Sequence, residues 1–444
     1  MERKNAWEKY PEGEKRELVY RFAEDYRRFL SECKTERECV TVFEEEAKKA
    51  GFVKLEEMIE AGTALKAGDK VYANNMGKGL ALFVIGSKDL SCGMNILGAH
   101  IDSPRIDLKQ DPLYEDSELA MLDTHYYGGI KKYQWVTLPL ALHGVIAKKD
   151  GTLVQVNVGD KPGDPVFGIS DLLVHLSAEQ MEKKAAKVIE GENLDLLVGS
   201  IPLTEEAADE KAAKEKVKAN IMKLLVKEYG IEEEDFLSAE IEVVPAGEAR
   251  DYGFDRSMIM GYGHDDRVCA YPSFRAMLMM EKPERTSVCL LVDKEEIGSV
   301  GASGMQSRFF ENTVAEVMNA AGSYSELALR RALKNSSVLS SDVSAAFDPN
   351  YPSVMTKRNT AYFGKGLVTG SRGKAGSNDA NAEYVGGLRA IMDANEIAFQ
   401  TAELGKVDQG GGGTIAYILA NYGMQVIDSG VAVLNMHSPW EIIS

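Results

Sequence analysis

The sequence predicts an α/β fold, in which a mostly parallel sheet flanked by helices is interrupted by a smaller β-rich domain. From about residue 246 onward, helix-like segments alternate with near-continuous apolar strands such as residues 286–293, the pattern of parallel sheets covered by helices. Between about 112 and 245 the pattern is β-rich, and Asp150-Gly151 marks a hairpin turn. With 444 residues, the chain is long enough for roughly two or three domains.

Two helices are expected before the first strands. In residues 14–32, Leu18, Phe22, Tyr26 and Leu30 recur at intervals of four, which makes one apolar stripe. A second helix follows and ends at Gly51, because glycine readily adopts the backbone conformation of a helix end. The short strands that come next are expected at residues 70–75, 79–86 and 94–102.

The remaining elements divide into a polar helix and the second half of the α/β pattern. Residues 204–230 are polar and helix-prone, which is typical of a solvated helix face, so no catalytic role is assigned to them. Beyond residue 246, helices are expected within 267–281 and 313–335. They separate apolar strands at 286–293, 336–342 and 430–437.

Composition excludes several classes of protein. The chain has 69 acidic and 51 basic residues and a net charge of −18, which argues against sequence-independent binding to nucleic acid or to an anionic membrane surface. The N-terminus has no apolar signal core, and no stretch reaches the roughly eighteen apolar residues of a membrane span. Five scattered cysteines form no CxxC pair, which suits a reducing compartment. We therefore expect a soluble, cytoplasmic protein.

Metal-capable side chains collect at the ends of the apolar strands. Since ligands of open α/β sheets bind beyond the carboxyl ends of the strands, these side chains are expected to converge. A single strand-end histidine is more often structural, but four such strand ends favour a metal site. The side chains are His100 and Asp102, Glu295 and Glu296, Asp342, and His437.

Two short motifs refine this hypothesis. Residues two apart on a strand face the same side, so Asp102 can hydrogen-bond the ring nitrogen of His100 that does not hold metal. The alternative is a His and an Asp on a polar edge. Asp265 and Asp266 follow glycines and precede an apolar helix, where one of them is a candidate to bridge two cations. Simple capping of the helix is the alternative there.

Ligands of the His, Asp and Glu types without cysteine favour zinc, cobalt or manganese. Two divalent ions about 3.5–4 Å apart would lower the pKa of a shared water towards about 7 and polarise a carbonyl. A free carboxylate would then collect the proton and return it to the leaving amine. One of Glu295 and Glu296 would thus bind metal and the other act as general base, although a solvated strand end is the alternative for this pair. The residues alone do not tell the two glutamates apart.

The motifs, in this order, resemble the aspartyl aminopeptidase and vacuolar aminopeptidase I family of dinuclear zinc metallopeptidases: GAHIDSPRIDLK, GHDDRVCAY, DKEEIGSVG, SSDVSAAFDPNY, SNDAN and MHSPWE. The likeness covers nearly the whole chain and is weakest around residues 185–240. It implies an exopeptidase that removes one amino acid from a peptide with a free N-terminus. The resemblance assigns His100, Asp265 and Asp342 to one metal and Asp265, Glu296 and His437 to the other. It makes Glu295 the general base and Asp102 the partner of His100.

The resemblance also implies a domain organisation and an assembly. Residues 1–111 and 246–444 would form the catalytic domain, with a β-rich dimerisation domain at 112–245. Dimers would build a tetrahedral dodecamer with enclosed active sites. His175 would reach the active site of a neighbouring subunit, and a packed helix residue is the alternative for it.

Substrate selectivity departs from the family pattern. Acid-selective members have a histidine where this chain has Ala345, and a lysine at about the position of Gly370. A neutral or broad preference is therefore expected. Lys365 and Lys374 are candidates to contact a substrate carboxylate, with solvated loop lysines as the alternative. Four consecutive glycines, residues 410–413, precede a helix without a phosphate-binding pattern; they would let the backbone approach the substrate or would form a flexible turn without a ligand.

Together these observations predict a metalloaminopeptidase with two divalent ions per subunit. Two rival functions stay open at this point. A related dinuclear hydrolase could cleave another small amide, such as that of an acyl-amino acid, by the same chemistry. A non-catalytic assembly or cargo protein could keep the fold without the activity, although the full set of ligands argues against this.

Overall fold

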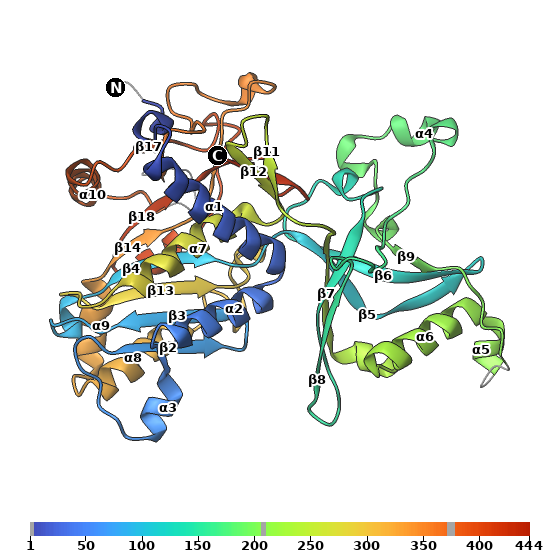
Figure 1. Cartoon of the computed structure of the whole chain (residues 1–444), viewed down its shortest axis with the longest axis horizontal. Coiled ribbons are helices and arrows are strands. Elements are labelled where there is room, and N and C mark those ends of the chain that lie inside the picture. Colours follow the sequence, from blue (N-terminus) through green and yellow to red (C-terminus); the bar gives the residue numbers. More distant parts are fainter. Residues whose placement is uncertain (1–3, 206–209, 371–377) are drawn as a thin grey trace. The chain divides into compact units, whose positions relative to one another are not determined.

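The computed structural model describes residues 4–205, 210–370 and 378–444 (Figure 1). Contacts divide the chain into two compact units. The first unit comprises Met1–Ser103, Ala249–Met436 and Glu441–Ser444. The second comprises Pro104–Glu248 and His437–Trp440. Among the described helices, none combines the length and apolar character that crossing a membrane requires.

In the described part of the chain, the first unit contains a nine-stranded sheet, ordered β1-β2-β3-β13-β4-β14-β18-β16-β17. Its central strands β13, β4, β14 and β18 are parallel neighbours, whereas β3 and β16 run antiparallel to their neighbours in this central group. The predicted α/β fold with a mostly parallel sheet is confirmed. The strands are β1 (Val53–Lys54), β2 (Lys70–Asn75), β3 (Gly79–Val84), β4 (Asn95–His100), β13 (Ser287–Val292), β14 (Ser337–Ser340), β16 (Leu367–Gly370), β17 (Phe399–Thr401) and β18 (Gln425–Gly430).

Helices cover the two faces of this sheet with separate apolar cores. Alternate residues of β4 contribute to different cores: Ile96 packs with α8, α9 and α11, whereas Ala99 packs with α1, α2 and α7. This alternation explains why the central strands are apolar along their whole length. The helices of the unit are α1 (Glu14–Glu32), α2 (Glu36–Lys49), α3 (Leu55–Glu60), α7 (His264–Met279), α8 (Phe309–Ala320), α9 (Glu326–Lys334), α10 (Ala382–Ala394) and α11 (Ala416–Ala420).

The two N-terminal helices form where the sequence predicts them, but the apolar stripe of α1 is only half used. Tyr26 and Leu30 are buried, whereas Leu18 and Phe22 are 53% and 46% exposed. The predicted helix and its apolar stripe are present, but only the C-terminal half of the stripe contacts the core. Helix α2 begins with a capping box, in which Thr35 and Glu38 each bond the other's backbone N–H.

A smaller sheet also belongs to the first unit. Five described strands form it in the order β11-β12-β20-β19-β15. It brings the C-terminal strand against the strand that precedes α7, because Gly261 of β12 pairs with Glu441 of β20. The strands are β11 (Arg250–Tyr252), β12 (Met258–Gly261), β15 (Ser344–Ala345), β19 (Ala432–Leu434) and β20 (Glu441–Ile443).

The second unit is built on an antiparallel sheet of six strands among the residues described, ordered β8-β7-β10-β5-β6-β9. The predicted hairpin at Asp150-Gly151 is confirmed, since it joins β7 to β8 and Gly151 has a φ of 89°. The polar stretch 204–230 contains α5 and α6, as predicted. The elements are β5 (Arg105–Asp116), β6 (Leu119–Tyr127), β7 (Leu140–Ala147), β8 (Leu153–Val158), β9 (Leu196–Gly199), β10 (Ala239–Pro245), α4 (Ala178–Met181), α5 (Glu210–Lys214) and α6 (Lys216–Tyr229).

Candidate metal centre

Parallel pairing brings several strand ends to one edge of the large sheet. Val292, the last residue of β13, is aligned with His100, the last residue of β4. On the other side of β4, Ser340 at the end of β14 is aligned with Gly98. The residues that follow these strands therefore meet beyond the same edge, and they include Asp102, Glu295, Glu296 and Asp342.

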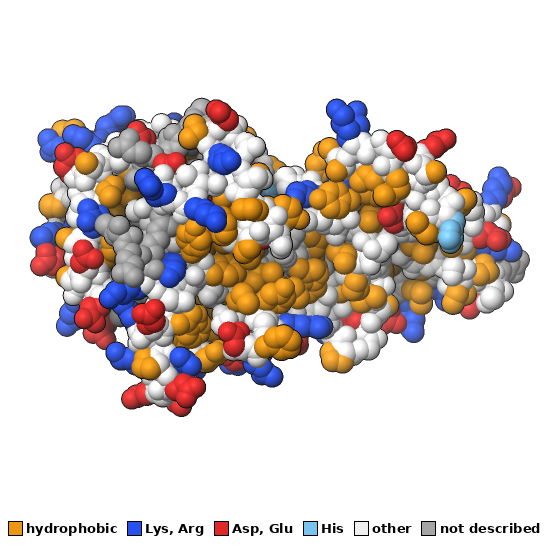
Figure 2. Space-filling model, turned by 90° about the horizontal axis from the view of Figure 1, so that it is seen from above, with side chains coloured by type: hydrophobic (Ala, Val, Ile, Leu, Met, Phe, Trp, Pro, Cys, Tyr) orange, Lys and Arg blue, Asp and Glu red, His pale blue; other side chains and the backbone are white. Residues whose placement is uncertain are grey.

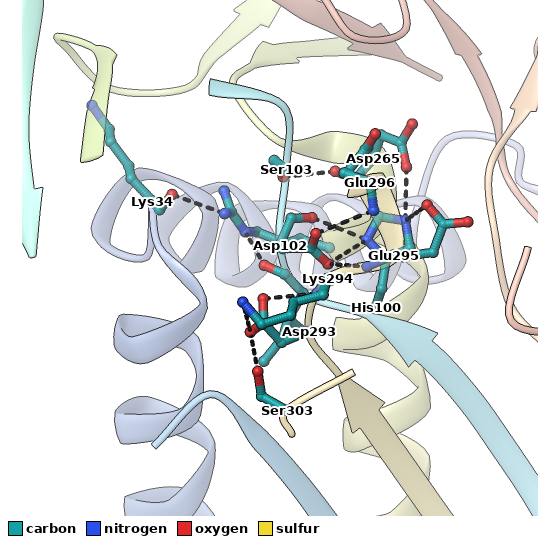
Figure 3. Close-up of polar contacts among 12 residues, drawn as sticks. Lys34, His100, Asp102, Ser103, Asp265, Asp293, Lys294, Glu295, Glu296 and Ser303 are labelled. Carbon is teal, nitrogen blue, oxygen red and sulfur yellow. Dashed lines mark hydrogen bonds and ion pairs between the residues drawn. The ribbon is translucent and has the colours of Figure 1, made fainter. Parts of the chain in front are cut away.

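His100 is held between carboxylates and is buried (Figure 3). Its Nε2 lies 3.1 Å from Oδ1 of Asp265 and 4.0 Å from Oε2 of Glu295. Its Nδ1 lies 3.0 Å from the carbonyl oxygen of Asp102 and 3.3 Å from the carboxylate oxygen Oδ1 of the same residue. Nδ1 of His100 thus contacts Asp102, and Nε2 faces the carboxylates of Asp265 and Glu295.

The two adjacent glutamates do not lie on a strand. After β13 the chain turns at Lys294, whose φ of 67° is in the left-handed region, and Glu295 and Glu296 begin a short 3-10 turn, Glu295–Ile297. The backbone N–H groups of both glutamates donate to the carboxylate of Asp102, at 3.2 and 3.3 Å (Figure 3). Asp102 therefore fixes this turn as well as the imidazole of His100.

The cluster carries an excess of buried negative charge. Burial opposes protonation of His100, but hydrogen bonds to Asp102 and Asp265 outweigh it and hold the pKa of the imidazole well above its usual range. Burial, followed by the charge of Asp266, raises the pKa of Asp342. Burial likewise raises the pKa of Asp266. A bound cation would offset this concentration of acidic groups.

The donor atoms of this unit fit a divalent metal ion. One ligand atom each of His100, Asp265 and Asp342 lie within 4.8 Å of one another, and the same holds for His100, Glu295 and Glu296. These donors are imidazole nitrogen and carboxylate oxygen, a set that zinc accepts in catalytic sites. The residues present therefore fit the metal that the sequence predicts.

Two side chains that the sequence analysis did not single out contact Asp265. The hydroxyl of Ser103 donates to the carbonyl oxygen of Asp265, and Glu441 accepts from its N–H. Both lie in motifs that carry the resemblance, directly after HID and at the end of MHSPWE. Their motif positions were the only available signal, because the contacts join segments far apart in the sequence.

Comparison with known proteins agrees with this geometry. The family described as "Aminopeptidase I zinc metalloprotease (M18)" matches residues 29–444. This chain belongs to the M18 family. It is therefore a hydrolase of the zinc-dependent aminopeptidase type, and the family resemblance found in the sequence is confirmed.

Relatives of this M18 chain include proteins of known structure. A "Probable M18 family aminopeptidase 1" of Clostridium acetobutylicum is 65% identical over 100% of this chain and 95% of its own length. The crystal structure of aminopeptidase I from Clostridium acetobutylicum matches with a TM-score of 0.92 and 62% identity, covering 100% of this chain and 96% of that one. An M18 aminopeptidase from Thermotoga maritima gives a TM-score of 0.93 at 45% identity, with the same coverage.

Four predicted site residues remain: His437, His175, Lys365 and Lys374. His437 starts the segment His437–Trp440 of the second unit, where its Nδ1 lies 2.9 Å from the carbonyl oxygen of Gly129. His175 is exposed in a 3-10 turn of the second unit, so the alternative of a packed helix residue does not hold. Lys365 lies just before β16, and Lys374 lies outside the described residues.

Close packing explains why glycine is needed at Gly410, the first residue of the glycine-rich stretch. A Cβ on Gly410 would lie 1.4 Å from the carbonyl oxygen of Leu404, so only glycine fits there.

Thr414, which follows the glycines, donates its hydroxyl to the carboxylate of Asp428 on β18 at 2.6 Å. Burial raises the pKa of Asp428 to about 6, although the Thr414 hydrogen bond acts in the opposite direction. Whether the loop backbone reaches a substrate stays a prediction.

The raised pKa of Asp428 predicts a pH-dependent cost to stability. The folded protein holds the proton more tightly than the unfolded chain, so stability from this group falls as pH rises from about 4 to above 6. Asp428→Asn stays neutral and keeps an acceptor for Thr414. It should gain stability over the parent across this range, by up to about 3 kcal/mol at neutral pH.

Denaturant unfolding of both metal-stripped proteins at matched pH values between 4 and 8 measures this difference. Effects of all other titrating groups are shared by the two proteins and cancel. A difference in unfolding free energy that is the same at every pH would show that Asp428 does not titrate in this range.

Proposed function

We propose that this aminopeptidase removes the N-terminal residue of peptides at a site that holds two zinc ions bridged by Asp265. One ion would be held by His100, Asp265 and Asp342. The observation that carries this assignment is the convergence of one donor atom from each of these three side chains within 4.8 Å. The three side chains come from β4, α7 and the connection after β14, segments far apart in the sequence, so the set depends on the fold and not on one local motif.

The second ion would be held by Asp265, Glu296 and His437. Support for Glu296 comes from its place beside Glu295 on the same short turn, which presents two carboxylates near His100. His437 directly follows Met436, whose side chain packs on the core that also contains α7. Its φ of 65° is unusual for a non-glycine residue, and such backbone geometry is concentrated at functional sites.

Glu295 is proposed as the general base. Its carboxylate is only partly buried, with 15% of the side chain exposed, and one oxygen lies 4.0 Å from His100 Nε2. It can therefore accept a proton from water in the site and pass it to the leaving amine. When bound, the zinc ions would supply a water that ionises near neutral pH and would polarise the scissile carbonyl. Asp102 would keep His100 in one tautomer and hold the turn that carries Glu295.

The substrate is proposed to be a peptide with a free N-terminus, with a neutral or broad preference for its first residue. Neither Ala345 nor Gly370 offers a charged side chain to an acidic residue, and Ala345 lies on β15 while Gly370 ends β16. Lys365 is the described lysine closest in sequence to Gly370, so it is the candidate for any residual contact with a carboxylate.

Glu295→Gln tests the proposed base. The amide keeps the shape of the side chain but cannot accept the proton, so zinc content should be unchanged while kcat falls by about 10²–10⁴-fold. Glu57→Gln, at an exposed position of α3, is the matched control and should retain full activity. The rate of hydrolysis of X-Ala dipeptides, with metal content measured on the same samples, decides the outcome. A wild-type kcat at full zinc occupancy would rule out this role.

The same assay tests the substrate class when N-acetylated dipeptides are added. We expect metal-dependent release of the first residue only from peptides with a free amine, and release of Leu or Met at least as fast as that of Asp or Glu. Cleavage restricted to the acetylated peptides would instead indicate an acyl-amide hydrolase.

We also propose that the chain self-associates, with dimers as the building block of a tetrahedral dodecamer. Large apolar side chains are exposed along one segment of the second unit, a feature typical of interfaces. These are Leu172, Leu173, Val174, Leu176 and Met181. Hydrophobic side chains also gather on the face shown in Figure 2, among charges of both signs. Yeast Ape1, described as a dodecamer, shares the fold with a TM-score of 0.77 at 20% identity.

Sedimentation velocity tests this proposal. Val174→Asp places a charge at a side chain that is 77% exposed, so it should weaken association without disturbing the fold. Ile59→Asp, at a 39% exposed position of α3, is the control and should sediment like the parent. A parent protein that is monomeric at micromolar concentration would contradict the proposal.

A further inference from the structure

We infer that Ser103 and Glu441 are positioning residues, which hold the backbone of Asp265 from both sides so that its carboxylate can bridge two zinc ions. The inference rests on the proposed function of Asp265 as the bridging ligand. It assigns a role to two side chains that do not themselves offer a ligand atom to the proposed ions.

The two contacts are hydrogen bonds to the two polar groups of the Asp265 backbone, its N–H and its carbonyl oxygen. The N–H of Asp265 donates to Oε2 of Glu441 at 2.9 Å. The carbonyl oxygen of Asp265 accepts from the hydroxyl of Ser103 at 2.7 Å. Ser103 and Glu441 are each 1% exposed, so water does not compete for either hydrogen bond. Figure 3 shows Ser103 beside Asp265, next to the glutamate turn.

Hydrogen bonding within helix α7 does not hold the backbone of Asp265 in place. Asp265 lies within the element His264–Met279, but its φ of −79° and ψ of 105° are not helical, and Asp266 is also irregular. Regular hydrogen bonding along α7 therefore does not set the orientation of Asp265. Side chains from two other segments supply the partners instead: Glu441 from β20 and Ser103 from the connection after β4.

The two residues before Asp265, Gly263 and His264, are closely packed, so the backbone at Asp265 has little freedom to move. The preceding residue, His264, is buried, and both of its ring nitrogens have partners: Nδ1 lies 2.8 Å from the hydroxyl of Tyr26 and Nε2 lies 3.2 Å from the carbonyl oxygen of Ile259. Before it, Gly263 has a φ of 79°, and a Cβ there would lie 3.0 Å from the Ser103 hydroxyl oxygen and 2.2 Å from the Arg267 guanidinium. The segment that carries Asp265 is thus fixed at each successive residue.

The two contacts differ in their chemistry. Glu441 is a buried carboxylate, and hydrogen bonds to a charged acceptor are about twice as strong as neutral ones. Ser103 makes a neutral hydrogen bond that can be removed with one atom. Residues that orient metal ligands typically contribute about 10–100-fold to metal affinity, which is the effect expected for either side chain.

The test compares zinc affinity in Ser103→Ala and Glu441→Gln with that of the parent, by competition with a chelator. Ser103→Ala removes the donor to Asp265, so its zinc dissociation constant should rise about 10–100-fold. Glu441→Gln keeps an acceptor but loses the charge, and should show a smaller rise. Ser273→Ala is the matched control: Ser273 is also buried, at 6% exposed, and its hydroxyl donates to the carbonyl oxygen of Cys269 in the same helix, away from Asp265. It should bind zinc like the parent.

Thermal unfolding of the metal-free variants separates positioning from general stability. Positioning predicts that Ser103→Ala and Ser273→Ala unfold at similar temperatures without zinc but differ in zinc affinity. Equal zinc affinity in these two variants would overturn the inference.

His100→Ala and Asp265→Asn identify which proposal has failed in that case. If both of them lose zinc while Ser103→Ala does not, the positioning role is wrong and the proposed metal site stands. If neither loses zinc, the proposed site itself is wrong.

Discussion

Buried negative charge at one edge of the central sheet is the constraint on which the rest of the structure depends. Carboxylates of Asp265, Asp266 and Asp342 lie close enough to His100 for each to influence its surroundings, and two of them have raised pKa values because of burial. Such a cluster is costly without a compensating cation. Asp265 and Asp342 of this cluster are proposed zinc ligands, so zinc bound there would offset this cost.

The parallel centre of the sheet explains how these groups can be brought together. Strands β13, β4 and β14 are adjacent and end at the same level, so the residues beyond their ends share one space. Two apolar cores hold the strands from opposite faces. Asp102 links His100 to the turn that carries the two glutamates. Its backbone carbonyl and its carboxylate contact His100, and its carboxylate accepts hydrogen bonds from the N–H groups of Glu295 and Glu296. Loss of this one side chain would affect a ligand and the proposed base together.

Much of this could be predicted from the sequence, because strand periodicity and strand-end chemistry are local signals. The α/β class, the hairpin at Asp150-Gly151 and the gathering of acidic groups beyond apolar strands all follow from patterns of a few residues. The part of α1 that meets the core could not be predicted, since the apolar stripe runs along the whole helix. Leu18 and Phe22 are exposed although they continue the stripe of Tyr26 and Leu30.

Other features depend on contacts between distant segments. The support of Asp265 by Ser103 and Glu441 joins positions 103, 265 and 441, and no local pattern indicates it. The peptide bond between Asp265 and Asp266 is cis, a form that is rare without proline and has no sequence signal here. The different roles proposed for Glu295 and Glu296 likewise rest on family resemblance, because the two side chains are chemically identical.

Anomalous diffraction at the zinc edge, from crystals of this protein grown with zinc, tests the central claim most directly. Two strong peaks are expected about 3.5–4 Å apart, with the carboxylate of Asp265 between them. One of the peaks should lie among the donor atoms of His100, Asp265 and Asp342. A single peak, or peaks that do not contact Asp265, would contradict the account.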